Sequence, residues 1–307
     1  MRPRVGAPST YDAYGLCIAS AIPLPLPSRR GTQVDLEIRR GSVDCDGVRF
    51  ADLDAGGDDI WLEKGWGDAR VVLRFAELTA QLSTETSVIV VDASGTDDLD
   101  HVAHLVIDHV VPQWLAMRGD LVLHAGAVQA PSGRVVAFVG ESGRGKSTTT
   151  TALSQIGWGF VADDACRLVR TAAGHDVVPS YPGVRLLAES RAALVPDLPS
   201  RPMADGAAKH RVTPNLQAAA DRPVPLSLVV ELGADSALQT HRMSLSDATA
   251  CLARHSFYLA AAEESLAAQT FLLASALALD VPCLRVDFPR RWDVFPDLAA
   301  HLEAALT

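Results

Sequence analysis

The spacing of hydrophobic and polar residues changes along this chain of 307 residues. Up to about residue 93, short apolar or alternating runs are separated by Gly, Pro and Asp. Such runs are typical of strands, because successive side chains of a strand point to opposite faces. The runs are YGLCIAS, VDLEIRR, DIWLEK, ARVVLRF and SVIVVDA. The first part of the chain is therefore predicted to be rich in β-structure.

A helical period replaces this pattern over residues 97–117. Asp97 and Asp98 are typical helix-start residues, and Pro112 is expected to kink or interrupt the helix. The helix carries three histidines, His101, His104 and His109. No acidic ligand accompanies them at a metal-binding spacing, so we expect them to pack in the core rather than to bind a metal.

From Leu121 onward the pattern alternates strand, loop, helix and strand. We expect strands at LVLHAGAVQA and RVVAFVG, a helix at KSTTTTALSQI and a strand at WGFVADD. Further strands are predicted at ACRLVR, HDVVPSY, PLSLVVEL and PCLRVDF, and further helices over residues 245–258, 262–280 and 292–306. Residues 186–215 have weak periodicity and are predicted to include long loops. The fold class is therefore α/β, with a β-rich N-terminal domain over residues 1–95 and a second domain over residues 96–307.

Composition limits the classes of function. The net charge of −10 disfavours non-specific binding to nucleic acid. The longest apolar stretch, LAAQTFLLASALAL, ends after roughly fifteen residues and is too short to span a membrane. The N-terminus lacks the apolar segment of a secretory signal. The five cysteines are scattered, which predicts reduced thiols and a cytoplasmic protein. They are Cys17, Cys45, Cys166, Cys251 and Cys283. A homo-oligomer is left open.

A phosphate-binding motif lies between the expected strand VVAFV and the expected helix STTTTAL. Residues 140–147, GESGRGKS, fit the pattern G-x-x-x-x-G-K-[ST] in full. Glycines let backbone N–H groups close around phosphate oxygens, and a helix N-terminus adds donors and a favourable dipole. We expect Lys146 to bind the β- and γ-phosphates of ATP and the Ser147 hydroxyl to bind Mg²⁺. The predicted nucleotide-binding residues are Gly140, Ser142, Gly143, Arg144, Gly145, Lys146, Ser147 and Thr148.

Two carboxylates, Asp163 and Asp164, follow this helix after an unusually short interval, in GFVADD. A strand–helix–strand connection within one sheet is almost always parallel, so both aspartates should lie at the same sheet edge as the phosphate loop. One carboxylate is then expected to hold Mg²⁺, and the other to orient an acceptor hydroxyl and take its proton. The alternative is one functional aspartate and one that caps a turn.

Other polar residues are weaker candidates. His124, in LVLHAGAV, either lines the same pocket or is a hydrogen-bonded core residue. Lys209 is one of only three lysines among 27 basic residues, which points to a role that arginine would not fill. Arg185 and Arg211 would neutralise a transferring phosphoryl group or hold an acidic peptide end. The alternative for each arginine is an ordinary surface charge.

The segments LHAGAV, GRVVAFVGESGRGKSTTTTAL and GWGFVADDACRL together resemble the HPr kinase/phosphorylase family over residues 121–170. ATP-dependent phosphoenolpyruvate carboxykinases share the early aspartate pair. The resemblance implies a P-loop kinase core over residues 96–307, with ATP and Mg²⁺ as cofactors. By analogy Asp164 would bind magnesium and Asp163 would be the base, although the roles of the two could be exchanged. The catalytic residues would be Asp163, Lys146, His124, Arg185 and Lys209.

The flanking segments YDAYGLCIASAIPLPLP, SYPGVRLL and KHRV look like the HPr-kinase-like proteins of lasso-peptide biosynthesis. That resemblance implies phosphorylation of a serine hydroxyl of a ribosomal precursor peptide. The first hundred residues differ from true HPr kinases, and a long Gly-rich segment after the core is missing. The resemblance therefore does not extend to HPr as the substrate or to the reverse phosphorolysis.

Three hypotheses follow for the function. The first is an ATP-dependent kinase that acts on a serine or threonine of a peptide or small protein. The second is a small-molecule kinase, which the β-rich N-terminal part mildly disfavours. The third is a non-catalytic ATP-binding regulatory module. A GTPase switch is not expected, because the chain lacks an N-K-x-D motif.

Overall fold

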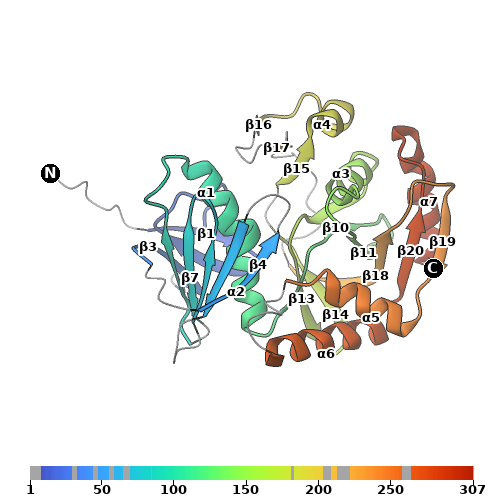
Figure 1. Cartoon of the computed structure of the whole chain (residues 1–307). Helices are drawn as coiled ribbons and strands as arrows, with labels where there is room; N and C mark the ends of the chain where they lie inside the picture. The colour runs from blue at the N-terminus through green and yellow to red at the C-terminus, as the bar shows by residue number, and fades with distance from the viewer. Residues whose placement is uncertain are drawn as a thin grey trace. The chain divides into compact units, whose positions relative to one another are not determined.

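The computed structural model describes residues 8–29, 33–43, 48–54, 59–64, 70–83, 85–180, 183–202, 209–212, 222–257 and 264–306. Cys45 and the YP dipeptide at residues 181–182 lie outside these ranges. The chain divides into two compact units. Unit 1 is Met1–Gly119 with Tyr258–Ala267, and unit 2 is Asp120–Phe257 with Ala268–Thr307. Figure 1 shows the elements of both.

Unit 1 is built on an eight-stranded sheet in the order β1-β2-β3-β8-β7-β6-β5-β4. Its strands are β1 (Ser9–Ala13), β2 (Leu16–Ser20), β3 (Leu36–Arg40), β4 (Val48–Asp54), β5 (Asp59–Lys64), β6 (Arg70–Arg74), β7 (Thr79–Ser83) and β8 (Val88–Asp92). Strands β4 to β8 form an antiparallel meander. In β7 and β8 every second residue is buried, which is the alternation expected of a sheet with one face on a core. The predicted β-rich character of this part is confirmed.

The histidine-bearing segment is helical but not uniform. It consists of α1 (Leu99–Leu105), a π-helical turn η1 (Val106–Val110) and α2 (Val111–Met117). The wide turn is closed by the N–H of Val111, which donates to the carbonyl of Val106. Pro112 follows directly and has no N–H to continue the α-helical ladder, so the predicted interruption at this proline is confirmed.

This helical segment belongs to unit 1, whereas the predicted boundary after residue 95 assigned it to the second domain. The hydroxyl of Tyr14 donates to the carbonyl of Ile107 at 3.1 Å, and His101 Nε2 lies 3.3 Å from Glu77 Oε2. These contacts join the helix to the sheet of unit 1, and the division between the units falls after Gly119.

Unit 2 contains a nine-stranded sheet in the order β12-β10-β11-β18-β14-β13-β9, with β20 also beside β18 and β19 beside β20. The strands are β9 (Leu121–Leu123), β10 (Gly126–Gln129), β11 (Val135–Val139), β12 (Gly159–Ala162), β13 (Cys166–Thr171), β14 (Gly174–Val178), β18 (Val224–Leu232), β19 (Gln239–Arg242) and β20 (Cys283–Asp287). The helices are α3 (Lys146–Gln155), α4 (Ala188–Leu194), α5 (Leu245–Arg254), α6 (Glu264–Asp280) and α7 (Phe295–Ala305), with a short 3₁₀ turn η2 (Trp292–Val294) before α7. The α/β class is confirmed.

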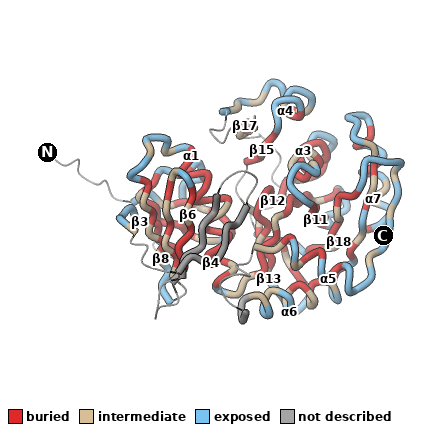
Figure 2. The backbone as a smooth tube through the Cα atoms, viewed as in Figure 1, coloured by how far each residue is buried: buried red, intermediate tan, exposed pale blue. Residues whose placement is uncertain are grey.

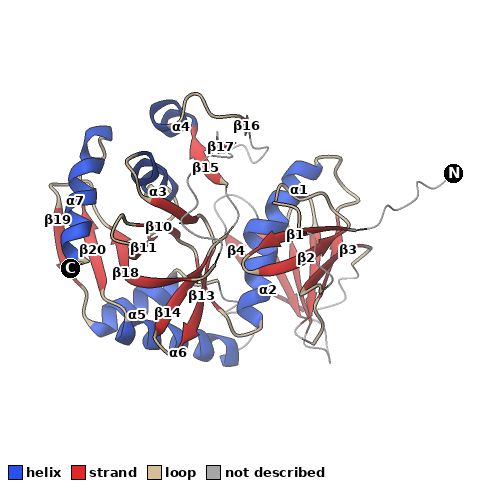
Figure 3. Cartoon of the chain, turned by 180° about the vertical axis from the view of Figure 1, so that it is seen from behind, coloured by secondary structure: helices blue, strands red, loops and turns tan. Residues whose placement is uncertain are grey.

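Helices cover both faces of this sheet (Figure 3). Val135, Ala137 and Val139 point into a core with residues of α5 and α6, whereas Val136 and Phe138 point into a second core with residues of α3 and α7. All five residues of β11 are buried, as expected for a strand covered on both sides (Figure 2). The sheet is thus the middle of three layers, with helices on both sides, and it contains β11, the strand that leads into the phosphate loop.

The expected strand LVLHAGAVQA is two strands. β9 pairs with β13, and β10 pairs with β11 and β12. The break falls at His124 and Ala125, where the chain leaves one part of the sheet for another. His124 therefore lies at a strand end, where its side chain can turn toward the site.

A small three-stranded sheet and α4 lie in the region that was predicted to include long loops, so its described residues contain more regular structure than expected. The order is β15-β17-β16, with β15 at Val184–Leu187, β16 at Ser200–Pro202 and β17 at Lys209–Val212. Phe160, Val184, Leu186, Val195 and Val212 form its own small core. Each strand has only three or four residues, too few to reveal a period in the sequence.

Candidate nucleotide-binding and catalytic site

The phosphate motif forms a loop between β11 and α3. Gly140, Gly143 and Gly145 have positive φ angles of 151°, 79° and 92°. Gly145 is the N-cap of α3, and its carbonyl accepts the first helical bond from the N–H of Thr149 at 2.8 Å. A left-handed cap of this kind favours glycine, because a side chain would be strained there. The first N–H groups of α3 are thereby directed toward the concave side of the loop.

Lys146 is buried in this loop, with 7% of its surface exposed. Its Nζ donates to the carbonyl of Gly140 at 2.7 Å and to that of Glu141 at 3.3 Å. Burial lowers the pKa of Lys146 to about 8; the charge of Asp163 raises it, and the charges of Lys209 and Arg185 lower it. Four of the predicted catalytic residues are thus close enough to interact electrostatically.

The remaining loop residues differ in exposure. Arg144 is exposed, and its Nη2 lies 3.6 Å from a carboxylate oxygen of Glu141. Ser147 is half-buried, and its carbonyl accepts from the hydroxyl of Thr151 at 2.7 Å. The Thr148 hydroxyl lies 3.1 Å from that of Ser190 on α4, which joins the start of α3 to the small sheet region.

The two aspartates follow β12 at the same sheet edge as the loop. β10 pairs antiparallel with both β11 and β12, so these two strands run in the same direction on either side of it. Ala127 of β10 lies opposite both Ala137 and Ala162, so the last residue of β12 is level with Ala137, two residues before the end of β11. The predicted position of the aspartates is confirmed, with β10 inserted between the two strands.

Asp163 is buried, with 2% of its surface exposed. It packs against Gly126 of β10 and Thr150 of α3: a Cβ built on Gly126 would lie 3.2 Å from Asp163 Oδ1 and 2.6 Å from Thr150 Cγ2. The absence of a side chain at residue 126 therefore makes room for this carboxylate between the strand and the helix.

Asp164 has a positive φ of 68°, which is uncommon for a residue other than glycine. The N–H of Ala165 donates to the carbonyl of Asp163 at 2.8 Å and closes a three-residue turn around Asp164. Turns of this kind with positive φ are rare and strained, and strained residues cluster at functional sites. The turn directs the two neighbouring carboxylates to different partners.

His124 and Arg185 both contact Asp164. A carbonyl only accepts, so His124 Nδ1 donates to the Asp164 carbonyl at 3.0 Å, and the same nitrogen lies 3.7 Å from Asp164 Oδ1. Arg185 forms a largely buried ion pair with Asp164. The backbone N–H of His124 donates to the carbonyl of His255. His124 is therefore held at the site rather than in a core.

Three arginines form a row across the small sheet. Arg185 of β15 lies directly opposite Arg211 of β17, which lies directly opposite Arg201 of β16. Side chains of directly opposed residues project from the same face of a sheet. Lys209 lies opposite Leu187 at the end of the same strand pair. The structure therefore brings Arg185 and Arg211 together and adds Arg201, which sequence reasoning missed.

Arg290 is a further basic residue at the loop that sequence reasoning missed. A Cβ built on Gly145 would lie 3.7 Å from Arg290 Nη1. Arg290 Nη2 donates to the carbonyl of Gly233 at 2.8 Å, and its guanidinium lies 4.5 Å from the centre of the Phe288 ring. Burial lowers the pKa of Arg290, and the charge of Arg144 adds to this. No local pattern in the sequence marks this arginine, because it follows β20 far from the motif.

Burial lowers the pKa of His255 to about 4, and the positive charge of Lys146 lowers it further. The imidazole thus lies within electrostatic range of the phosphate loop.

Among the residues that the structure describes, no helix has the combination of length and apolarity that crossing a membrane would require. The described cysteines are free and buried. They are Cys17, Cys166, Cys251 and Cys283. The cytoplasmic location stays a prediction.

No protein-family model and no curated protein matches this chain. Among solved structures, the HPr(Ser) kinase/phosphatase from Coxiella burnetii is a structural neighbour, at 12% sequence identity and a TM-score of 0.32. The match covers 60% of this chain and 95% of the neighbour. Similarity at this level assigns no role to any residue of this chain.

Proposed function

We propose that this chain is an ATP-dependent kinase that transfers the γ-phosphate to a serine or threonine hydroxyl of a peptide or small protein. One observation carries the proposal: two buried carboxylates, Asp163 and Asp164, lie at the sheet edge that also holds the phosphate loop and Lys146. A protein that only binds a nucleotide needs one metal carboxylate, whereas hydroxyl transfer also needs a proton acceptor.

The loop residues fit a magnesium-bound triphosphate. The ammonium of buried Lys146 donates to two loop carbonyls. Burial lowers its pKa, and the charges of Lys209 and Arg185 lower it further, so a bound anion would stabilise its charged form. Residues 140–148 would hold the phosphates, and Ser147 with Asp164 would hold Mg²⁺. The metal, when bound, offsets charge on the phosphate oxygens.

Asp163 is proposed as the base. It would accept the proton of the acceptor hydroxyl while the hydroxyl oxygen forms its bond to the γ-phosphorus. The bond from the γ-phosphorus to the bridging oxygen breaks in the same step, and ADP leaves. Lys146 and Lys209 would offset the charge on the phosphoryl group, and Arg185 with His124 would orient the Asp164 turn.

The arginine row supports an acidic acceptor. Arg185, which pairs with Asp164, stands in one row with Arg211 and Arg201, and guanidinium groups bind carboxylates in a bidentate manner. A ribosomal precursor peptide of the lasso type, phosphorylated near its C-terminus, is the acceptor that the flanking resemblance favours. A small-molecule acceptor and a non-catalytic ATP-binding module are the alternatives.

Mass spectrometry tests the proposal directly. A candidate precursor peptide encoded beside this gene is incubated with the protein, ATP and Mg²⁺, and a gain of one phosphate on serine is expected. Asp163→Asn should keep ATP binding and lose transfer, while Asp164→Asn should weaken Mg²⁺ binding. Retained transfer in Asp163→Asn would overturn the base assignment. Loss of transfer in Asp164→Asn together with weaker Mg²⁺ binding in Asp163→Asn would exchange the roles of the two aspartates. Absence of transfer to any serine or threonine peptide, with ATP still bound, would favour the regulatory module.

A further inference from the structure

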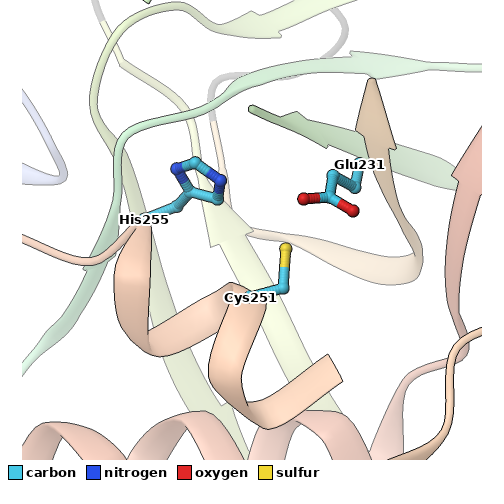
Figure 4. A group of neighbouring side chains, drawn as sticks. All are labelled: Glu231, Cys251 and His255. Carbon is cyan, nitrogen blue, oxygen red and sulfur yellow. The ribbon is translucent and has the colours of Figure 1, made fainter. Parts of the chain in front are cut away.

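A second group of metal-ligating side chains lies in unit 2, outside the predicted site residues. Glu231, Cys251 and His255 each offer one ligand atom, and the three atoms lie within 4.8 Å of one another. Figure 4 shows the three side chains converging, with one ring nitrogen of His255 turned toward the other two residues. Cys251 and His255 are buried.

Helix α5 and strand β18 together position these three residues. Cys251 and His255 are four residues apart at the C-terminal end of α5, so they lie on one helix face. Cys251 belongs to the core between α5 and the sheet, which Val229 of β18 also lines. Glu231 lies two residues after Val229 and so points from the strand to the same face.

One of the three donor atoms, on His255, has no partner among the described residues. His255 is only 7% exposed, and among the described residues its Nε2 has no hydrogen-bond partner. An unpartnered buried polar atom is costly, and a bound ion is one of the explanations for it. The thiol of Cys251 is hydrogen-bonded to Glu231. Burial is the largest of the causes that raise the pKa of this thiol to about 12, followed by the charge of Glu231.

We propose that Glu231, Cys251 and His255 form a binding site for a transition-metal dication of the zinc class. A tetrahedral zinc site has bonds of about 2.0–2.3 Å, so its ligand atoms are about 3.5 Å apart. Atoms that already lie within 4.8 Å need only side-chain rotation to converge. A thiolate with an imidazole suits zinc and disfavours magnesium, which takes oxygen ligands.

Charge balance also supports a dication here. The thiol proton of Cys251 leaves to solvent on binding, and the resulting thiolate with the Glu231 carboxylate carries two negative charges. Together they neutralise the metal, so its charge adds little repulsion toward nearby Lys146. Neutral His255 supplies a lone pair without changing this balance.

The fourth coordination position is proposed to face a pocket of about 340 Å³ that Glu231 and Cys251 line. Met243, Asp247, Arg254 and Arg285 also line it. Three protein ligands with one open position are the pattern of zinc sites that bind a water or a small anion. Since the ligands come from both α5 and β18, the metal would also tie the helix to the sheet beside the phosphate loop.

The test uses the full-length protein treated with a chelator and then titrated with Zn²⁺ or Co²⁺ in the absence of nucleotide. One bound metal per chain is expected by elemental analysis, with a sulfur-to-cobalt charge-transfer band and a rise in Tm that grows with Zn²⁺ concentration. Excess Mg²⁺ should not displace the metal. Because no step involves ATP, failure of the kinase proposal would leave this result unchanged.

Variants assign the ligands. Cys251→Ser should remove the charge-transfer band, and Glu231→Gln and His255→Gln should each weaken Zn²⁺ binding about 10- to 100-fold, as removal of outer-shell partners already does in other metal sites. Two control variants, Cys17→Ser at a buried cysteine of unit 1 and Cys283→Ser, should leave Zn²⁺ binding unchanged. Glu231 is only half-buried, so its variant remains informative if the Cys251 variant does not fold. Less than one metal per chain, a cobalt spectrum without the thiolate band, or loss of binding in Cys283→Ser would each overturn the assignment.

Discussion

At the scale of single residues, Lys146 is the most sensitive reporter of the site. Its buried ammonium contacts two loop carbonyls and has a pKa of about 8. A bound phosphate would stabilise the charged form and raise this pKa. At a pH between the free and bound values, ATP binding should therefore take up a proton.

Calorimetry at pH 8–9 in two buffers of different ionisation enthalpy measures this uptake. Lys146→Met should abolish it and weaken ATP binding by about tenfold or more, because charge-assisted hydrogen bonds contribute about 1.5–3 kcal/mol. Lys146→Arg is the matched control, since an arginine that stays charged takes up no proton even where ATP still binds. Unchanged uptake in both variants would rule out Lys146 as its source.

A second prediction at the residue scale concerns Gly126. An alanine methyl group would meet Thr150 Cγ2 at 2.6 Å and Asp163 Oδ1 at 3.2 Å. Gly126→Ala should lower the free energy of unfolding by about 1–3 kcal/mol, as overpacking does. Gly95→Ala is the control, because a Cβ there meets nothing within 4 Å. Urea unfolding compares the two, and equal stabilities would show that the carboxylate and helix can give way.

At the scale of elements, the three-stranded sheet supplies the arginine row. If Arg201 and Arg211 hold an acidic peptide, Arg201→Gln and Arg211→Gln should each weaken its binding about five- to tenfold, with a smaller salt dependence than in the unmodified protein. Arg170→Gln, at an exposed arginine of β13, is the control. Fluorescence anisotropy with a labelled acidic peptide at two salt concentrations measures this. Equal losses of peptide affinity in all three variants would show that the arginine row acts only as general surface charge.

The elements also show which parts of the fold the local sequence pattern predicts. The strand, loop and helix from β11 to α3 were predictable because one continuous segment contains the strand, the glycines and the helix start. The break between β9 and β10 was not predictable, because neighbouring apolar residues continue through it and only the pairing partners change. The same holds for β15 and β17, whose few residues are ordered by packing against each other.

At the scale of the whole molecule, stability should depend on pH through buried histidines. Burial lowers the pKa of His175, which lies 3.4 Å from Asp280 at the end of α6, below its ordinary value of 6.5. Asp280 and Asp176 raise that pKa and Arg170 lowers it, without reversing the effect of burial. The unfolded state therefore binds more protons than the folded state below about pH 6.5.

Stability from this residue is present above pH 6.5 and is lost as pH falls through the folded pKa. Urea unfolding between pH 7.5 and pH 5 should show this fall, and His175→Gln should show a shallower one. His241→Gln, at an exposed histidine, is the control and should keep the full slope. A slope that is unchanged in His175→Gln would assign the pH dependence to other groups.

The sequence by itself determined the phosphate loop, the early aspartate pair and the α/β class, because each depends on residues that are close in the chain. A complete motif and a short strand–helix–strand connection leave few geometries. Tertiary structure alone decided which distant residues join them. The pairing of β18 with β11, the packing of α5 on the sheet and the register of the small sheet bring in Glu231, His255 and Arg201. Their positions depend on contacts between segments far apart in the chain, which local spacing does not encode.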